Sequence, residues 1–360
     1  MENEVEELIE QVDSANYKCP ECGAPMRYDP ATQSLKCDYC TKIIELKEES
    51  SNIELDFNQD VNIDNSWQNE NHIIKCQNCG AENIVSKKEI SLKCPFCSST
   101  QVVESESIAG IKPSRVIPFK IDSNQALETY RGLIKRKLFV PKYIKKMNLD
   151  LTLNGVYIPV WTYDTKTFST YKGKLGKHYV TTVGTGKNRR TVTKTRYFLI
   201  SGTKIVDFDD VLVSAGSSIS QEELNHLKPF NTNDSATFDE SFLAGFSTEH
   251  YSKDLNKGFN DAKDAMQPII KNYILKQYSY DVVSYVNINT HYDNIKYKYV
   301  LIPVWFGLFK HQDKLYRFLV NGESGKITAK YPISAFKVLL VVIICIAVFI
   351  GFLLLVKYFG

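Results

Sequence analysis

Histidine, methionine and tryptophan are scarce in this sequence, and familiar catalytic motifs are missing. The 360 residues include six histidines, four methionines and three tryptophans. No two histidines have the spacing of metal ligands on one helix, and neither HExxH nor GxSxG occurs. Gly184-Thr185-Gly186-Lys187 is only part of a phosphate loop, because Thr181 replaces a required glycine and Asn188 replaces a required hydroxyl. We therefore expect no enzyme and no small-molecule substrate.

The N-terminus lacks the marks of a cleaved secretory signal. Residues 1–6 contain no basic side chain, and no apolar stretch follows them. The composition is that of globular proteins, with 43% hydrophobic and 24% charged residues. At roughly 100–200 residues per domain, the length leaves room for two or three domains.

Cysteine is almost absent after residue 100, whereas eight cysteines before it form two identical patterns. Each pattern reads C-x2-C-x14-C-x2-C, and the second begins 57 residues after the first. Two equal spacings of this kind indicate a tandem repeat. The predicted metal ligands are Cys19, Cys22, Cys37, Cys40, Cys76, Cys79, Cys94 and Cys97.

Each four-cysteine set predicts a zinc ribbon. Four thiolates in tetrahedral geometry select Zn(II), and a filled sulfur shell leaves no position for a catalytic water. We therefore predict two structural zinc ions. An iron–sulfur centre and a disulfide framework are the alternatives, and thiolate sites favour a reducing, cytoplasmic compartment. Gly23 and Gly80 follow the first pair of each set, where a left-handed backbone is often needed.

Acidic residues dominate the first part of the chain. Residues 1–111 contain 9 Lys and Arg against 21 Asp and Glu. Such a surface opposes phosphate binding by the ribbons and favours contact with protein. The predicted segments are a short amphipathic helix over 1–14, ribbons over 15–44 and 72–102, and an acidic flexible linker over 45–71.

Two runs lack acidic residues altogether. Residues 131–146 contain seven Lys and Arg, and residues 166–196 contain nine. A solvated face, anionic lipid, nucleic acid and an acidic protein partner are the four interpretations. The candidate contacts for lipid or another polyanion are Arg131, Lys135, Arg136, Lys137, Lys187, Arg189, Arg190, Lys194 and Arg196.

Residues 338–356 contain neither charge nor proline. At about 1.5 Å per residue this run spans roughly 28 Å, close to the thickness of a bilayer's hydrocarbon core. Lys326, Lys330 and Lys337 precede the run and Lys357 follows it, which favours a cytoplasmic location for the preceding bulk. We predict a tail-anchored, single-pass protein of the cell membrane.

The stretch 112–335 predicts one α+β domain with antiparallel sheet. Helices are expected over 124–138, after a capping box at Ser220, and over 255–277 with an interruption or start near Pro268. The sequence Ile158-Pro159-Val160-Trp161 recurs at 302–305 and suggests a possible internal repeat with both tryptophans in the core.

Several ordered motifs resemble those of a bacterial family, the TFIIB-type zinc-ribbon-containing membrane proteins. These motifs are the CPxCG ribbon at 19–23, the segments 187–190 and 195–197, Asp209 to Val213, Phe242 to Phe246, Pro303 to Trp305, and Val320 to Lys326. Some members are encoded beside phage-shock-protein-A-like and SPFH (flotillin-like) proteins. The resemblance implies a role in recruiting such partners to the membrane in envelope stress, and it supplies no catalytic residues.

These observations favour an adaptor. Its ribbons and α+β domain would bind partner proteins at the cytoplasmic face, with the basic runs near anionic lipid. The alternative is a membrane-associated nucleic-acid-binding protein that uses the basic surface of residues 166–196. We expect nucleic acid to be the weaker interpretation because the ribbons are acidic.

Overall fold

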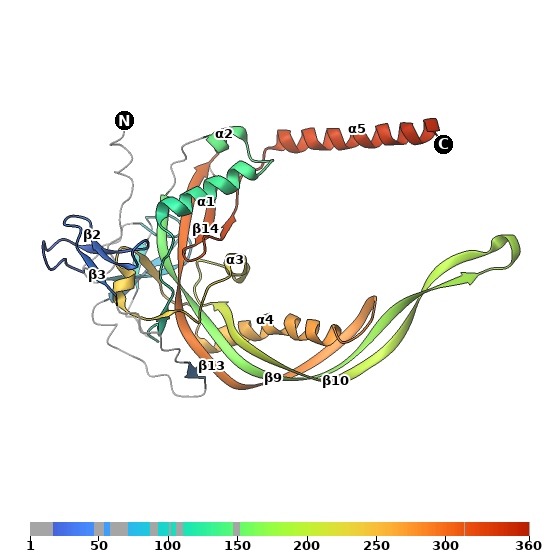
Figure 1. The fold of residues 1–360 in the computed structure, drawn as a ribbon, viewed down its shortest axis with the longest axis horizontal. Coiled ribbons are helices and arrows are strands. Elements are labelled where there is room, and N and C mark those ends of the chain that lie inside the picture. The colour runs from blue at the N-terminus through green and yellow to red at the C-terminus, as the bar shows by residue number, and fades with distance from the viewer. Residues whose placement is uncertain are drawn as a thin grey trace.

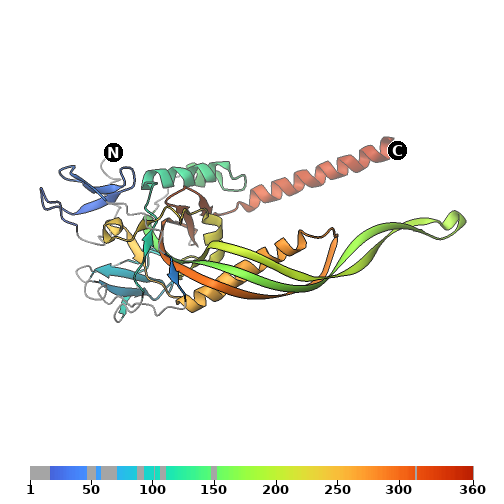
Figure 2. The same cartoon turned by 60° about the horizontal axis from the view of Figure 1, so that its bottom comes forward.

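The computed structural model describes residues 17–46, 54–57, 71–86, 93–100, 102–105, 111–146, 152–312 and 314–359. The helix predicted over 1–14 lies outside the described residues. The molecule has a body at one end, from which a long β-hairpin and a C-terminal helix extend to the same side (Figures 1 and 2). The chain is a mixed α+β protein, as predicted.

Three long antiparallel strands form the central part of the larger sheet: β9 (Thr152–Val183), β10 (Arg190–Ser214) and β13 (Val282–His311). β9 pairs with β10 on one side and with β13 on the other. The pairing with β13 ends at Gly176, so that the rest of β9 pairs only with β10. We call the three-stranded part, residues 164–176, 197–208 and 282–293, the blade. We call the two-stranded hairpin of residues 177–196 the arm.

Shorter strands complete two sheets in the body. The small sheet contains β1 (Met26–Asp29), β2 (Ser34–Cys37) and β3 (Ile43–Glu45). The larger sheet adds β4 (Leu55–Asp56), β5 (Asn71–Cys76), β6 (Glu82–Ser86), β7 (Val102–Ser105), β8 (Arg115–Val116), β11 (Ala236–Thr237), β12 (Ser247–Glu249), β14 (Lys314–Asn321) and β15 (Ile327–Ala329). Strand β12 pairs with both β9 and β6, and therefore joins the second cysteine module to the main sheet.

Helices cover the sheet where their apolar positions recur at helical spacing. α1 (Ser123–Arg136) begins with the Asp122 capping box and buries Tyr130, whose ring stacks on Phe318 at 3.9 Å. α4 (Leu255–Leu275) lies on the inner side of the blade (Figure 1). It continues through Pro268, so the predicted interruption is wrong: the proline faces solvent, and packing along the buried side holds the helix together. The remaining helices are α2 (Lys142–Lys146), α3 (Gln221–Leu227), α5 (Ala335–Phe359), η3 (Gly186–Asn188) and η4 (Glu240–Leu243).

The two Ile-Pro-Val-Trp motifs lie on neighbouring strands. Ile158 of β9 pairs with Ile302 of β13, so the motifs run antiparallel about this pair. Pro159 lies where the outer neighbour of β9 changes from β12 to β10, a position at which a missing N–H is tolerated. Both tryptophans are buried, as predicted; the internal repeat itself stays a prediction.

The predicted flexible linker contains an ordered segment in its middle. β4 pairs with β13 at Tyr297 and Lys296, and Lys296 forms a 2.9 Å ion pair with Glu54. The expectation of a tether that is flexible throughout is therefore wrong at residues 54–57. Phe57 supplies an apolar contact that the acidic composition concealed, since its ring packs against Phe259 of α4.

Candidate metal centres and contact surfaces

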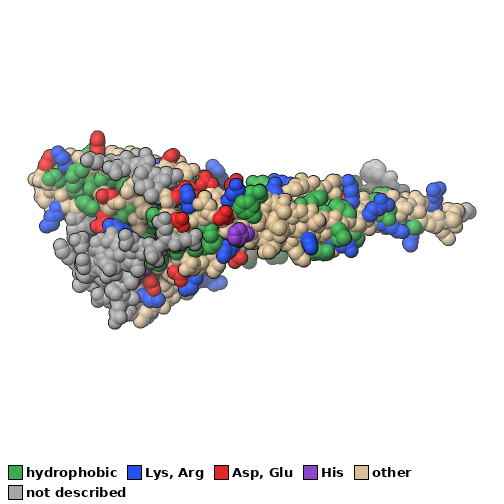
Figure 3. Space-filling view, turned by 90° about the horizontal axis from the view of Figure 1, so that it is seen from below, with side chains coloured by type: hydrophobic (Ala, Val, Ile, Leu, Met, Phe, Trp, Pro, Cys, Tyr) green, Lys and Arg blue, Asp and Glu red, His purple; other side chains and the backbone are tan. Residues whose placement is uncertain are grey.

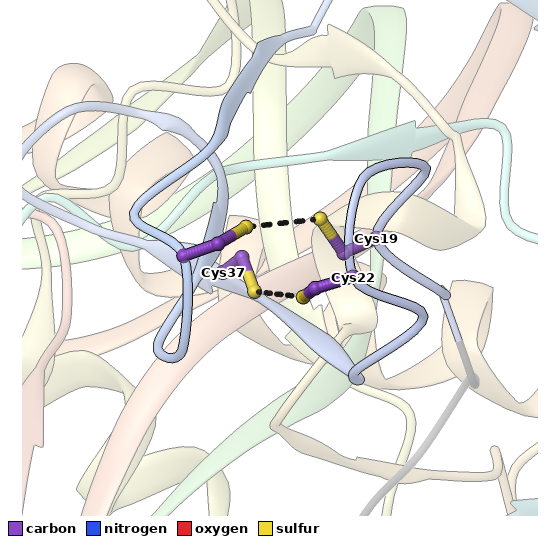
Figure 4. A group of neighbouring side chains, drawn as sticks. Cys19, Cys22 and Cys37 are labelled. Carbon is purple, nitrogen blue, oxygen red and sulfur yellow. Dashed lines mark hydrogen bonds between the residues drawn. The ribbon is translucent and has the colours of Figure 1, made fainter.

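The first four-cysteine set converges on one point. Cys19 and Cys22 come from one turn and Cys37 and Cys40 from another, and the turns face each other (Figure 4). The Sγ–Sγ distance is 3.4 Å between Cys19 and Cys40 and 3.5 Å between Cys22 and Cys37. All four sulfurs lie within 4.8 Å of one another and could hold one metal ion.

The second set has the same geometry. The Sγ–Sγ distance is 3.6 Å between Cys76 and Cys97 and 3.7 Å between Cys79 and Cys94. The Asn78 amide also donates to the Cys97 sulfur at 3.6 Å. Both predicted metal-ligand sets are thus assembled, each from two turns.

All four turns share one backbone pattern. The N–H four residues after each first cysteine donates to that cysteine's carbonyl oxygen, and the donors are Gly23, Thr41, Gly80 and Ser98. Each of these residues has a positive φ, between 57° and 76°. Glycine fits this conformation without a steric cost. The sequence therefore indicated the turns at Gly23 and Gly80, but it held no signal for those at Thr41 and Ser98.

Proximity of the sulfurs makes the acidity of the second set uneven. A hydrogen bond from Cys94 lowers the pKa of Cys79 to about 5, and the same contact with Cys79, together with burial, raises the pKa of Cys94. The Cys79 thiol therefore loses its proton readily, whereas the neighbouring Cys94 thiol keeps its proton. A divalent cation at the centre would stabilise all four thiolates together, and binding would release the remaining protons.

The two modules are attached differently to the rest of the chain. The first packs through Tyr28, whose ring contacts Phe242 and Phe246. The second is part of the large sheet, because β6 pairs with β12 and the His250 N–H donates to the Glu82 carbonyl oxygen at 2.8 Å. Loss of the second centre should therefore disturb the main sheet directly.

A buried carboxylate lies beside the second module. Glu249 of β12 is 0% exposed and accepts hydrogen bonds from the backbone N–H groups of Ser217 and Ser218, both at 2.8 Å. Burial raises the pKa of Glu249 to about 7, and the hydrogen bonds from the serines only partly offset that effect.

A third cluster contains carboxylates rather than thiols. Oxygens of Glu54, Asp164 and Asp209 lie within 4.8 Å of one another. Two lysines contact Glu54 of this cluster, Lys296 at 2.9 Å and Lys298 at 3.9 Å, and Lys298 also pairs with Asp210 at 2.7 Å. Burial, together with the neighbouring carboxylates, raises the pKa of Asp164 to about 7. Asp209 is exposed, whereas the side chain of its neighbour Asp210 is largely buried. We interpret the cluster and its ion pairs as the contact that holds β4 against β13.

The predicted basic contacts separate into two groups that lie apart. Arg131, Lys135 and Arg136 lie in the second half of α1 and Lys137 is its C-cap, and this helix ends next to the start of α5 (Figure 1). Arg189, Arg190, Lys194 and Arg196 belong to the arm; the side chain of Lys187 lies outside the described residues. The structure therefore does not bring them into one surface.

The outer face of the blade is an exposed surface that the sequence reasoning missed. Between residues 165 and 171 of β9, odd-numbered side chains are buried on the side of α4 and even-numbered ones are exposed. Large apolar side chains lie on the exposed side among lysines (Figure 3). They are Phe168, Tyr197, Leu199, Ile205 and Tyr285, with Lys166, Lys172 and Lys174 between them. Counting alternate residues along each predicted strand could have identified these exposed side chains.

The C-terminal helix is apolar on every side. Residues 335–358 contain a window of mean hydropathy 3.5, and none of that window is buried against the described chain. By length and composition α5 could cross a membrane.

Comparison with known proteins finds a distant similarity. A Bacillus subtilis (strain 168) chain described as "Uncharacterized protein YdjG" is 27% identical over 325 residues, which cover 90% of this chain and 92% of that protein. No family model matches the chain, and no solved structure matches it.

Proposed function

We propose that the protein is a membrane-anchored adaptor that binds a partner protein on the cytoplasmic side. The observation that carries this proposal is the outer face of the blade. Exposed apolar patches on soluble surfaces commonly mark contacts with other molecules. Leu199 is 76% exposed on this face, although buried leucines are usual in sheets.

Zinc is the metal that best fits the two four-cysteine centres. A tetrahedral ion with Zn–S bonds of about 2.3 Å requires sulfurs about 3.8 Å apart. The nearest sulfur pairs lie 3.4–3.7 Å apart, so a small adjustment would accommodate the ion. When bound, zinc would crosslink each pair of turns and fold the module, and four thiolates leave no place for substrate.

The membrane assignment rests on α5 and on the charges around it. α5 would span the bilayer as a single pass, and the lysines before it favour a cytoplasmic body. Reduced thiolate centres require the same compartment. The arm and α5 leave the body on the same side (Figure 2).

The outer face also limits the chemistry of the partner. Lysines flank the apolar side chains, and Lys174 lies 5.0 Å from the centre of the Tyr197 ring. A partner that presents an apolar ridge bordered by acidic residues is complementary to this face. The resemblance in sequence makes phage-shock-protein-A-like and SPFH proteins the first candidates, acting in envelope stress.

Affinity purification of the full-length chain from nuclease-treated, detergent-solubilised membranes tests the proposal. We expect Leu199→Ser combined with Tyr285→Ser to lose a specific protein partner that the wild type retains. Leu315→Ser, which alters a 55% exposed leucine outside the blade, is the matched control and should retain it. Both variants should stay in the membrane fraction.

Two results would contradict this function. Equal recovery of the partner by the blade variant and the control would remove the blade from the interface. Recovery of partners only when the nuclease treatment is omitted would favour the nucleic-acid alternative on the arm, and binding to nucleic acid should then weaken steeply with salt.

A further inference from the structure

Apolar side chains are exposed where α5 meets the body. The loop between α1 and α2 exposes 78% of Leu138, and the residues entering α5 expose 63% of Ile333 and 74% of Phe336. None of these side chains contributes to a buried cluster of the described chain. Exposure of these neighbouring apolar side chains to water is unfavourable, so we expect another surface to cover them.

Hydrogen bonds fix this loop to the base of α5. The Lys337 ammonium donates to the carbonyl oxygens of Leu138 at 3.0 Å and Val140 at 2.6 Å. The Ser334 N–H donates to the Phe139 carbonyl oxygen at 2.8 Å. The loop therefore keeps a defined position beside the first turn of the helix. We call residues 135–145 with residues 333–337 the corner.

Cations surround the apolar side chains of the corner. Lys135, Arg136 and Lys142 are exposed, and the Lys145 ammonium donates to the Lys135 carbonyl oxygen at 2.9 Å. Neither residues 129–146 nor residues 326–359 contain an acidic side chain. An apolar patch ringed by Lys and Arg is the composition of protein surfaces that lie in the interface of an anionic bilayer.

We infer that the corner is an interfacial anchor: Leu138, Ile333 and Phe336 enter the boundary between head groups and acyl chains, while Lys135, Arg136 and Lys142 bind anionic lipid phosphates. The inference rests on the proposed membrane span and adds a second contact to it. A bilayer is the occupant because the corner is continuous with α5. The basic residues of the arm do not belong to this anchor.

The corner also adds to the orientation argument. Counting charges along the sequence finds three lysines shortly before the span. The fold brings Lys135, Arg136 and Lys142 to the same end of α5, although they precede it by almost two hundred residues. Positive charge at the base of the helix is therefore greater than the local sequence indicates.

Tryptophan quenching tests the anchor in the full-length chain reconstituted into vesicles. Leu138→Trp should be quenched by lipids brominated on the acyl chain and should emit at shorter wavelength. Asn124→Trp is the matched control, because it is exposed at the opposite end of α1, about 20 Å away. Its added fluorescence should not respond to the brominated lipid.

The lipid charge is tested with the same reporter. Adding phosphatidylglycerol to phosphatidylcholine vesicles should increase the quenching of Leu138→Trp. The added substitutions Arg136→Gln and Lys142→Gln should abolish that increase, whereas Lys194→Gln on the arm should leave it unchanged. An increase that survives the corner substitutions would overturn the role of these cations.

Resistance to alkaline carbonate extraction separates the two claims. If α5 resists extraction and Leu138→Trp is quenched no more than Asn124→Trp, the anchor is wrong and the membrane span stands. If the chain is extracted, the span and the anchor both fail. Quenching in an extraction-resistant chain supports both.

Discussion

Glu249 is one buried carboxyl group that makes stability depend on pH. Its ordinary pKa of 4.5 is raised to about 7 in the folded chain, because burial disfavours the charged carboxylate more than the hydrogen bonds from the two serines favour it. Between about pH 4.5 and about pH 7, the folded state binds this proton and the unfolded state does not. The free energy of unfolding therefore falls by about 3 kcal/mol as pH rises through this window, from this group alone.

Glu249→Gln should remove this pH dependence while its amide oxygen still accepts from the serine N–H groups. Denaturant unfolding of the detergent-solubilised chain at about pH 5 and about pH 8 measures it. The wild type should lose more stability than the variant between these values. Glu222→Gln, at an exposed position on α3, should behave as the wild type does. Parallel profiles for wild type and Glu249→Gln would show that the carboxyl does not titrate in this range.

Residue types predicted the metal centres well and the surfaces poorly. Cysteine spacing identified all eight members of the two clusters, because the geometry of each cluster depends on local turns. The exposed apolar residues Leu138 and Leu199 were not predicted, since a single leucine in a basic stretch carries no pattern. Only the neighbours supplied by the fold show that each is uncovered.

The two metal modules, as elements, should respond differently to loss of one ligand. Cys94→Ser alters the module whose β6 pairs with β12, whereas Cys37→Ser alters the separate small sheet. Each substitution should lower the bound zinc from two ions to one. Cys94→Ser should also destabilise the main sheet by at least about 2 kcal/mol, because β12 loses a neighbour.

Hydrogen exchange of the backbone measures this difference. Exchange at Thr248 should accelerate in Cys94→Ser and remain near the wild-type rate in Cys37→Ser. The cysteines occupy equivalent positions of the repeat and both are buried, which makes each the control for the other. Equal acceleration in both variants would contradict the proposed difference in attachment.

Helices were more predictable than strands at the scale of elements. α1, α3 and α4 begin at capping residues, and their apolar spacing is local. The continuation of α4 past Pro268 was missed, because packing against the blade outweighs one lost hydrogen bond. The length of β13 could not be predicted, since its partner β9 lies far away in sequence.

The whole molecule divides into a body, a blade and an arm that contributes little to stability. Beyond Gly176 the arm lacks the third strand. Replacing residues 181–192 with Asn-Gly should therefore shift the thermal midpoint by no more than about 1 °C. Tyr171→Ala, within the blade, should cost about 3 kcal/mol, because it removes a buried ring and its hydrogen bond to Tyr278. A large loss from the arm replacement would show unrecognised contacts.

The pairing of β9 with β13 also determines the order in which the chain can assemble. Thr152 and Leu308 are partners although more than a hundred residues separate them, while β9 and β10 are joined by a short turn. The β9–β10 hairpin can form early, but the other edge of β9 stays unpaired until β13 has been synthesised. High contact order of this kind slows folding and leaves a nascent edge open to pairing with other chains. Lysines at alternate positions of β9, at 166, 172 and 174, oppose such pairing during that interval. The same lysines that form part of the proposed binding surface in the folded protein can thus also oppose aggregation of the incompletely synthesised chain.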